Sequence, residues 1–99
     1  LDLAHLNISC NLNDLDRDDA LNHIIENHGE RIHGIHLSDN NGVKDSHEPL
    51  TEGCWPLSAL NRYKEFFLNK EKLWITVESR RLPDDIILQQ QELVLQTFN

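Results

Sequence analysis

Three strand-like segments alternate with helix-like segments along this chain, and this order constrains the fold more than any other feature. Apolar residues recur at every second position in the strand-like segments and at every third or fourth position in the helix-like ones. The predicted strands cover residues 1–5, 31–38 and 73–78. Strands that alternate with helices are typical of parallel sheets with helical crossovers. The sequence therefore predicts an α/β fold with parallel strands.

The segments after the first two predicted strands differ in length and character. Residues 7–16 are rich in Asn and Asp and predict a polar loop. A helix capped by Asp16 or Asp18 follows and ends near His28 and Gly29. Its apolar face is formed by Ala20, Leu21, Ile24 and Ile25. After the second strand, residues 39–56 predict a long loop, and loops of this length are commonly functional or disordered.

Two further helices complete the predicted order of elements. The first begins at Pro56 or Leu57 and ends at Asn69. Its buried stripe is formed by Leu60, Tyr63, Phe67 and Leu68. The second begins near Pro83, with Asp84 and Asp85 in its first turn. Its apolar residues are Ile87, Leu88, Val94, Leu95 and Phe98.

Composition and charge exclude several classes of function. The chain is 38% hydrophobic and 26% charged, and no apolar run approaches the roughly 20 residues of a membrane helix. Its 17 acidic residues outnumber nine basic ones, which gives a net charge of −8. Nucleic-acid binding requires a basic surface that releases counterions, so nucleic acid is an unexpected partner for these residues.

The ends and the cysteines indicate a cytoplasmic protein of which this chain is a part. The first residues, LDLAHLNISC, include neither Met nor the basic region of a signal peptide, and we interpret this start as an internal cut. Cys10 and Cys54 are far apart and do not have the spacing of a zinc finger, which favours two reduced thiols.

Metal-ligand residue types stand at or just beyond the end of each predicted strand. Asp2 and His5 lie in the first strand, His36 near the end of the second, and Glu78 at the end of the third. The long loop adds Asp45 and His47. Carboxylate and imidazole groups hold divalent transition metals while leaving room for substrate. The pattern therefore predicts a metalloenzyme, although strict alternation would place Asp2 and His5 on opposite faces unless the strand ends or bulges between them.

Other interpretations of these residues stay open. Glu78 could form an ion pair with Arg80 or Arg81, and Asp45 and His47 could be solvated loop residues. Trp55 could line a pocket mouth as a stacking surface or simply pack within its loop. The three remaining histidines, His23, His28 and His33, are expected at the surface or near helices.

Four motifs in order resemble the C-terminal part of the xylose isomerase-like barrel superfamily. They are Asp2-x-x-His5, His36-Leu-Ser-Asp39, Asp45-x-His47 followed by Glu52-Gly53, and Val77-Glu78. This superfamily includes sugar and sugar-phosphate isomerases and epimerases, and also the endonuclease IV class of repair enzymes. The resemblance implies the last β/α units of a (β/α)₈ TIM barrel across residues 1–99. A complete barrel needs about 250 residues, so the domain would be incomplete.

The resemblance also implies roles for individual residues. Asp2, His36 and Glu78 would bind a divalent ion, with Mn²⁺, Mg²⁺, Co²⁺ and Zn²⁺ all compatible. His5 would be a ligand of a second metal or a substrate contact. Glu78 would also transfer a proton, and Asp45 and His47 match a pair that binds a further metal in the endonuclease-like members. Together with His5, we expect His47 and Trp55 to contact the sugar.

Two features depart from the family pattern. Thr51 replaces the first glycine of a common Gly-x-Gly, which gives Thr51-Glu52-Gly53. A further carboxylate ligand of the family lies on an earlier strand that this chain does not contain. We therefore expect the isolated chain to lack activity, and to self-associate or pair with the rest of the barrel.

Three functions follow as hypotheses. The first is a metal-dependent sugar or sugar-phosphate isomerase or epimerase, in which a proton is removed next to a carbonyl group while the metal holds the substrate oxygens. The second is a metal-dependent phosphodiesterase that resembles endonuclease IV. The third is a non-catalytic fragment that keeps family residues without a working site.

Overall fold

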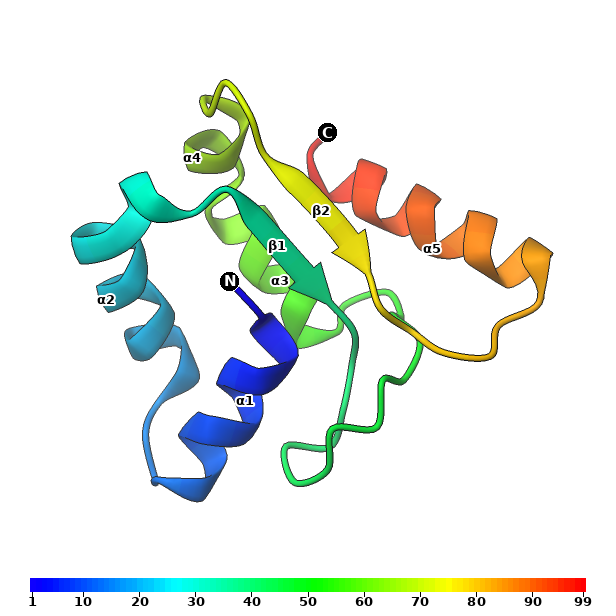
Figure 1. Ribbon diagram of the computed structural model, residues 1–99, viewed down its shortest axis with the longest axis horizontal. Coiled ribbons are helices and arrows are strands. Elements are labelled where there is room, and N and C mark those ends of the chain that lie inside the picture. Colours follow the sequence, from blue (N-terminus) through cyan, green and yellow to red (C-terminus); the bar gives the residue numbers. More distant parts are fainter.

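A computed structural model describes all 99 residues as a small parallel sheet with helices packed on one of its faces (Figure 1). Strands β1 (Gly34–Leu37) and β2 (Trp74–Val77) pair in parallel, as predicted. In chain order the helices are α1 (Leu3–Leu12), α2 (Arg17–His28), the 3₁₀ turn η1 (Gly29–Arg31), α3 (Trp55–Arg62), α4 (Lys64–Leu68) and α5 (Asp84–Thr97). Helix α3 lies behind the two strands in Figure 1, with α1 and α2 on one side and α5 on the other.

The two faces of the sheet differ sharply because side chains alternate along each strand. Ile35 and Leu37 point to the helices and are fully buried in the hydrophobic core. His36 lies between them and points the other way, and Trp74 of the paired strand is 74% exposed. No helix covers this second face, so polar groups on it reach solvent.

The predicted first strand and the loop after it are wrong. Only Leu1 and Asp2 pair with β1: the amide of His36 donates to the Leu1 carbonyl at 2.9 Å, and Asp2 forms a parallel bridge with His36. Helix α1 then occupies most of residues 1–16. The Asp2 carboxylate caps the start of this helix by accepting a hydrogen bond from the backbone amide of His5 at 3.0 Å. Leu3, Ala4 and Cys10 form its buried side.

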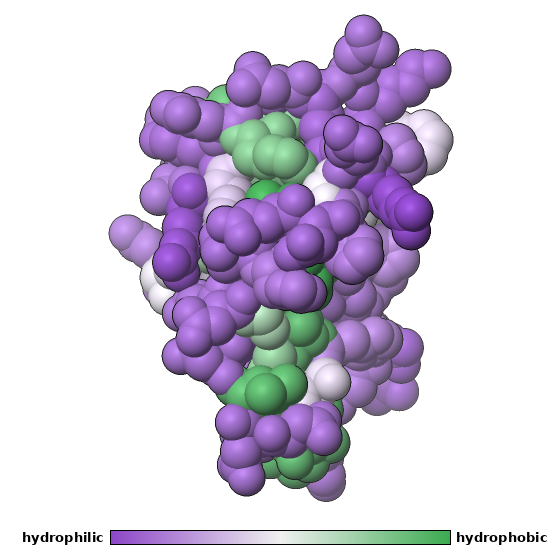
Figure 2. All heavy atoms as spheres, turned by 90° about the vertical axis from the view of Figure 1, so that its left-hand side faces the viewer, coloured by the Kyte–Doolittle hydropathy of each residue, from purple (hydrophilic) through white to green (hydrophobic).

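Helix α2 agrees with the sequence interpretation. Asp16 is its cap and accepts hydrogen bonds from the amides of Asp18 and Asp19 at 2.9 and 3.0 Å. Leu21 is buried, and Ile24 packs against the core. Figure 2 shows the flank of the molecule where α1 and α2 lie, which is largely hydrophilic with a narrow hydrophobic band.

The remaining helices differ from the prediction in three respects. The helix predicted from Pro56 to Asn69 is interrupted at Tyr63, whose backbone leaves helical geometry (φ −111°, ψ 22°) and whose hydroxyl donates to Asn22 at 2.9 Å. Leu60 and Phe67 are buried as predicted, but Leu68 is exposed. Helix α5 begins after Pro83 as expected. Three of its predicted core residues, Ile87, Leu88 and Leu95, are instead exposed.

None of these helices combines the length and apolar character needed to cross a membrane. Cys10 and Cys54 are free thiols, as predicted, and burial raises the pKa of the Cys10 thiol.

Gln90 is a buried polar residue that fastens the long loop to α5. Its side-chain amide accepts from the Leu50 amide at 2.5 Å and donates to the Leu50 carbonyl at 2.8 Å. Both residues are only 2% exposed, so water cannot replace these bonds. The pairing holds the end of the loop in the core.

We expect Gln90→Leu to lower the free energy of unfolding by about 2–4 kcal/mol, because it leaves two buried backbone groups of Leu50 without partners. The matched change Gln89→Leu, at an exposed position of the same helix, should alter it by less than about 0.5 kcal/mol. Urea denaturation followed by circular dichroism measures both. Equal effects of the two substitutions would contradict this role for Gln90.

Candidate metal centre

Asp2, His36 and Glu78 converge at the carboxyl ends of the paired segments. Asp2 and His36 face each other in the parallel bridge, and His36 lies opposite Thr76 in β2. Glu78 lies two residues beyond Thr76 and therefore returns to the same open face. One ligand atom from each of the three residues lies within 4.8 Å of the other two.

The donor set fits a divalent transition ion. Two ligands of one such ion, each about 2.0–2.2 Å from it, lie roughly 3 to 4.4 Å apart. The three donor atoms lie within 4.8 Å of one another, and the 2.8 Å contact between His36 Nδ1 and Glu78 Oε1 would have to lengthen slightly. Two carboxylates so close together repel each other, and His36 offsets this only in part. A cation would remove that repulsion.

The cluster remains accessible to a substrate or to water. The side chains of Asp2 and Glu78 are 21% and 29% exposed, and that of His36 is 52% exposed. Three protein ligands with open positions beside them are typical of catalytic rather than structural metal sites. Glu78 pairs with His36 and not with Arg80 or Arg81.

The other predicted residues, His5, Asp45 and His47, extend the cluster along the same edge. His5 lies one helical turn after Asp2, with Nδ1 3.2 Å from the Asp2 carboxylate and Nε2 2.9 Å from that of Asp45. His47 Nε2 is 3.3 Å from the same Asp45 oxygen, and its Nδ1 is 3.1 Å from the Glu78 carbonyl. These contacts link Asp2, His5, Asp45, His47 and Glu78 in that order. The contact between Glu78 and His36 adds the sixth residue.

The electrostatics of this second group centre on His5. Both of its ring nitrogens face carboxylates, an arrangement that a protonated imidazole satisfies with two N–H donors. The hydrogen bond with Asp45, aided by the charge of Asp2, raises the pKa of His5 above 6.5. The same bond lowers the pKa of Asp45 below 3.8, with a further contribution from His47.

The long loop is held against the strand ends by contacts that the sequence did not reveal. Asp39 and Glu48 exchange backbone hydrogen bonds of 2.9 Å, and the Ser79 hydroxyl donates to the Glu48 carbonyl at 2.9 Å. His47 adopts a left-handed backbone (φ 52°), and its carbonyl accepts from the Arg80 amide. These bonds set the direction of the His47 ring.

A second set of amides ties this loop to α1. Asn40 donates to the Ala4 carbonyl at 3.0 Å and accepts from Asn7 at 2.8 Å, while Asn11 donates to the Gly42 carbonyl at 2.9 Å. Asn7 and Asn11 are four residues apart and so lie on one face of the helix. This spacing of four residues is the sequence feature from which Asn7 and Asn11 could have been identified as residues that position the loop.

Trp55 does not join the cluster, which corrects its expected place at the mouth of the pocket. Its indole N–H donates to Asp18 at 2.9 Å, and the Arg17 guanidinium lies 4.7 Å from its ring. The bond and the cation–π contact hold it against α2. His23, His28 and His33 are exposed and also lie outside the cluster.

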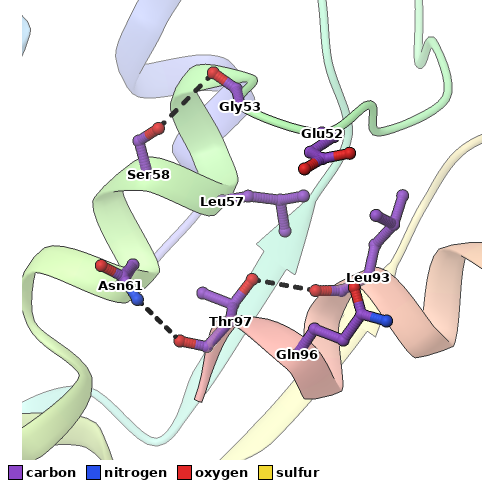
Figure 3. Close-up of a pocket in the computed structure, with 8 residues that line it drawn as sticks. All are labelled: Glu52, Gly53, Leu57, Ser58, Asn61, Leu93, Gln96 and Thr97. Atoms are coloured by element: carbon purple, nitrogen blue, oxygen red, sulfur yellow. Dashed lines mark hydrogen bonds between the residues drawn. The ribbon is translucent and has the colours of Figure 1, made fainter. Parts of the chain in front are cut away.

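A separate cleft of about 330 Å³ lies between α3 and α5 (Figure 3). Asn61 of α3 donates to the Thr97 carbonyl of α5 at 2.9 Å along it. Glu52 is the one charged residue of its lining, so it offers no comparable group of titratable side chains.

Comparison of the chain with protein-family models, curated proteins and solved structures finds no match.

We expect NMR titration of the metal-free chain to give His5 a pKa above 6.5, and Asp45→Asn to lower it. Asp14→Asn, at a left-handed position that Asn tolerates, serves as the control and should leave the pKa of His5 unchanged.

Because the folded-state pKa of His5 is raised, the contribution of His5 to stability is complete below pH 6.5 and is lost as pH rises through the folded pKa. The contribution of Asp45 is present above pH 3.8 and is lost as pH falls through its lowered pKa. A His5 pKa at or below 6.5 would contradict the observed geometry.

Proposed function

We propose that this chain forms the C-terminal β/α units of a (β/α)₈ barrel that acts as a metal-dependent sugar or sugar-phosphate isomerase or epimerase. The observation that carries the proposal is the convergence of Asp2, His36 and Glu78 at the carboxyl ends of parallel segments. Active sites of such barrels lie at this end of the strands. The resemblance of the four motifs to the xylose isomerase-like superfamily favours sugar isomerisation or epimerisation as the reaction.

The layering of the structure supports a barrel. Helices cover one face of the sheet, whereas the other carries His36, Thr76 and Trp74 and is open. In a barrel, the helix-covered face of the sheet points outward to the ring of helices, and the open face points into the barrel. The open face is also the one that bears the candidate ligands.

The residues of the cluster suit proton transfer next to a carbonyl group. A bound divalent ion would polarise the substrate carbonyl and stabilise negative charge on its oxygen. Glu78 would accept the proton from the adjacent carbon, since its carboxylate is on the open face and is already positioned by His36 at 2.8 Å. The ring nitrogens of His5 and His47 pair with Asp2, Asp45 and the Glu78 carbonyl, so these two histidines would position the groups along this side of the site. The family carboxylate expected on an earlier strand would return the proton.

One observation favours the phosphodiesterase resembling endonuclease IV as a second candidate. Asp45 and His47 lie next to the first cluster, where they could hold a further metal. The charge of the long loop opposes this candidate. Lys44 is its one basic residue, against the acidic residues Asp39, Asp45, Glu48 and Glu52. A loop of this charge would repel closely spaced phosphates.

We expect the 99-residue chain to bind one Mn²⁺ or Zn²⁺, and Glu78→Gln to weaken that binding by at least about tenfold, because it removes an anionic ligand. Glu71→Gln removes an equal charge from an exposed position on the same chain and should leave the affinity nearly unchanged. Isothermal titration calorimetry measures both variants, with circular dichroism as the check on folding. Equal affinities in the two variants would exclude Glu78 as a ligand.

In the full-length protein we expect metal-dependent exchange of a substrate C–H proton with solvent deuterium for a suitable ketose, and no incision of abasic DNA. Glu78→Gln should slow the exchange by about 100-fold or more, because a positioned general base contributes at least that factor. Proton NMR follows the exchange, and gel electrophoresis follows the DNA. Incision that His36→Ala abolishes would select the phosphodiesterase instead.

A further inference from the structure

Asn41 and Gly42 form the one Asn-Gly pair of the chain, and they lie in the long loop between β1 and α3. Asparagine is a thermolabile residue, and a following glycine makes loss of its side-chain amide easiest, because glycine has no Cβ to hinder attack by its own backbone nitrogen. The Asn41 side chain is exposed, so the water that completes this reaction reaches it. The fold therefore presents a reactive pair to solvent.

The side-chain carbonyl of Asn41 is held by two backbone donors. Its Oδ1 atom accepts a hydrogen bond from the amide of Val43 at 2.9 Å and from that of Lys44 at 3.2 Å. N–H groups aimed at a carbonyl oxygen stabilise the negative charge that forms on this oxygen when a nucleophile adds to the carbonyl carbon. The Nδ2 group of Asn41, which is the leaving group, makes no hydrogen bond in the structure, so no contact retains it.

The attacking nitrogen belongs to Gly42. The backbone of Gly42 is left-handed, with φ 83°, a conformation that glycine adopts without strain. This nitrogen is the next backbone atom after the Asn41 carbonyl carbon, so its attack on the Asn41 Cγ closes a succinimide ring. The loop thus supplies the nucleophile, the polarised carbonyl and an unrestrained leaving group within two residues.

We propose that Asn41 is a site of non-enzymatic deamidation, in which the Gly42 nitrogen attacks the Asn41 Cγ and forms a succinimide. The new Cγ–N bond forms as the Cγ–Nδ2 bond breaks. The N–H proton of Gly42 passes through solvent to the leaving amide, which departs as ammonia. Water then opens the ring. Hydrolysis at Cγ gives aspartate on a normal backbone, whereas hydrolysis at the backbone carbonyl gives isoaspartate, in which the chain continues through the side chain. No group is oxidised or reduced.

Isoaspartate at this position changes the connection between the loop and α1. The Gly42 amide donates to the Asn40 side chain at 2.9 Å, and the Gly42 carbonyl accepts from the Asn11 side chain of α1 at 2.9 Å. Isoaspartate adds a methylene group to the backbone immediately before Gly42 and a carboxylate beside it. The Gly42 carbonyl therefore moves away from Asn11, and the loop loses a bond to α1. The inference does not depend on the proposed function, because no candidate metal ligand takes part in the reaction.

Peptide mapping by mass spectrometry tests the proposal. We expect the folded 99-residue chain, kept in warm and mildly alkaline buffer, to gain the mass of amide-to-acid conversion in the peptide that contains Asn41. Asn69 is also exposed but precedes Lys70, so it is the internal control and should stay intact over the same time. The rate should rise with pH, because the Gly42 nitrogen must lose its proton to attack. Labelling by isoaspartate methyltransferase distinguishes isoaspartate from aspartate.

Two glycine substitutions form a matched pair for this test. Gly42→Ala should slow the reaction at Asn41 by about tenfold or more, because an added Cβ hinders the nitrogen and disfavours the left-handed backbone. Gly53 is also left-handed and lies in the same loop, with nothing within 4 Å of an added Cβ, so Gly53→Ala should leave the rate at Asn41 unchanged. Asn41→Gln should remove the reaction and remains informative if Gly42→Ala misfolds.

The variant Asn41→Asp separates the effect of the added charge from that of the added methylene group. It carries the charge on a normal backbone and should keep the bond between Asn11 and Gly42. The isoaspartate form, isolated by chromatography, should instead shift the side-chain amide NMR signal of Asn11 and speed hydrogen exchange of the loop amides.

Three results of the peptide mapping would overturn the deamidation site. They are an unchanged mass at Asn41, equal rates at Asn41 and Asn69, and deamidation that occurs only after unfolding in urea. The last of these would show that the folded loop protects Asn41. Identical NMR spectra of the isoaspartate form and of Asn41→Asp would overturn the proposed loss of contact between the loop and α1.

Discussion

The register of the parallel backbone pairing is the constraint on which the rest of the structure depends. The amide of His36 donates to Leu1 at 2.9 Å, that of Trp74 to His33 at 3.0 Å, and that of Glu78 to Leu37 at 2.7 Å. A slip of one residue would turn His36 into the core and Ile35 into solvent. The burial of Ile35 and Leu37 therefore specifies the position of His36, and the hydrophobic core and the candidate site stabilise the same register.

Asp2 connects this register to the helices. Its backbone continues the pairing with β1, whereas its side chain caps α1 and contacts His5. The positive end of the α1 dipole favours a carboxylate at this position. Because α1 starts there, His5 returns to the side of Asp2 after one turn. The helix thereby resolves the conflict that a continuous strand would create between the two residues.

The features of this arrangement that depend on residues close together in the chain could be predicted from the sequence. Alternation in β1 correctly separated Ile35 and Leu37 from His36, and the Asp16 cap followed from local chemistry. Helix α1 was missed because its asparagines have low helix propensity and are satisfied by distant partners, Asn40 and Gly42. Gln90 was missed for a related reason: a glutamine is usually exposed, and its partner Leu50 is 40 residues earlier in the chain.

Paramagnetic broadening by Mn²⁺ in the amide NMR spectrum of the chain tests whether Asp2, His36 and Glu78 form one metal site. We expect substoichiometric Mn²⁺ to broaden first the amides of these three residues and their neighbours. His36→Ala should remove that selectivity. Broadening that begins instead at the exposed acidic residues Asp14, Asp16 and Asp19, and that is unchanged by His36→Ala, would show that the three residues do not form a metal site.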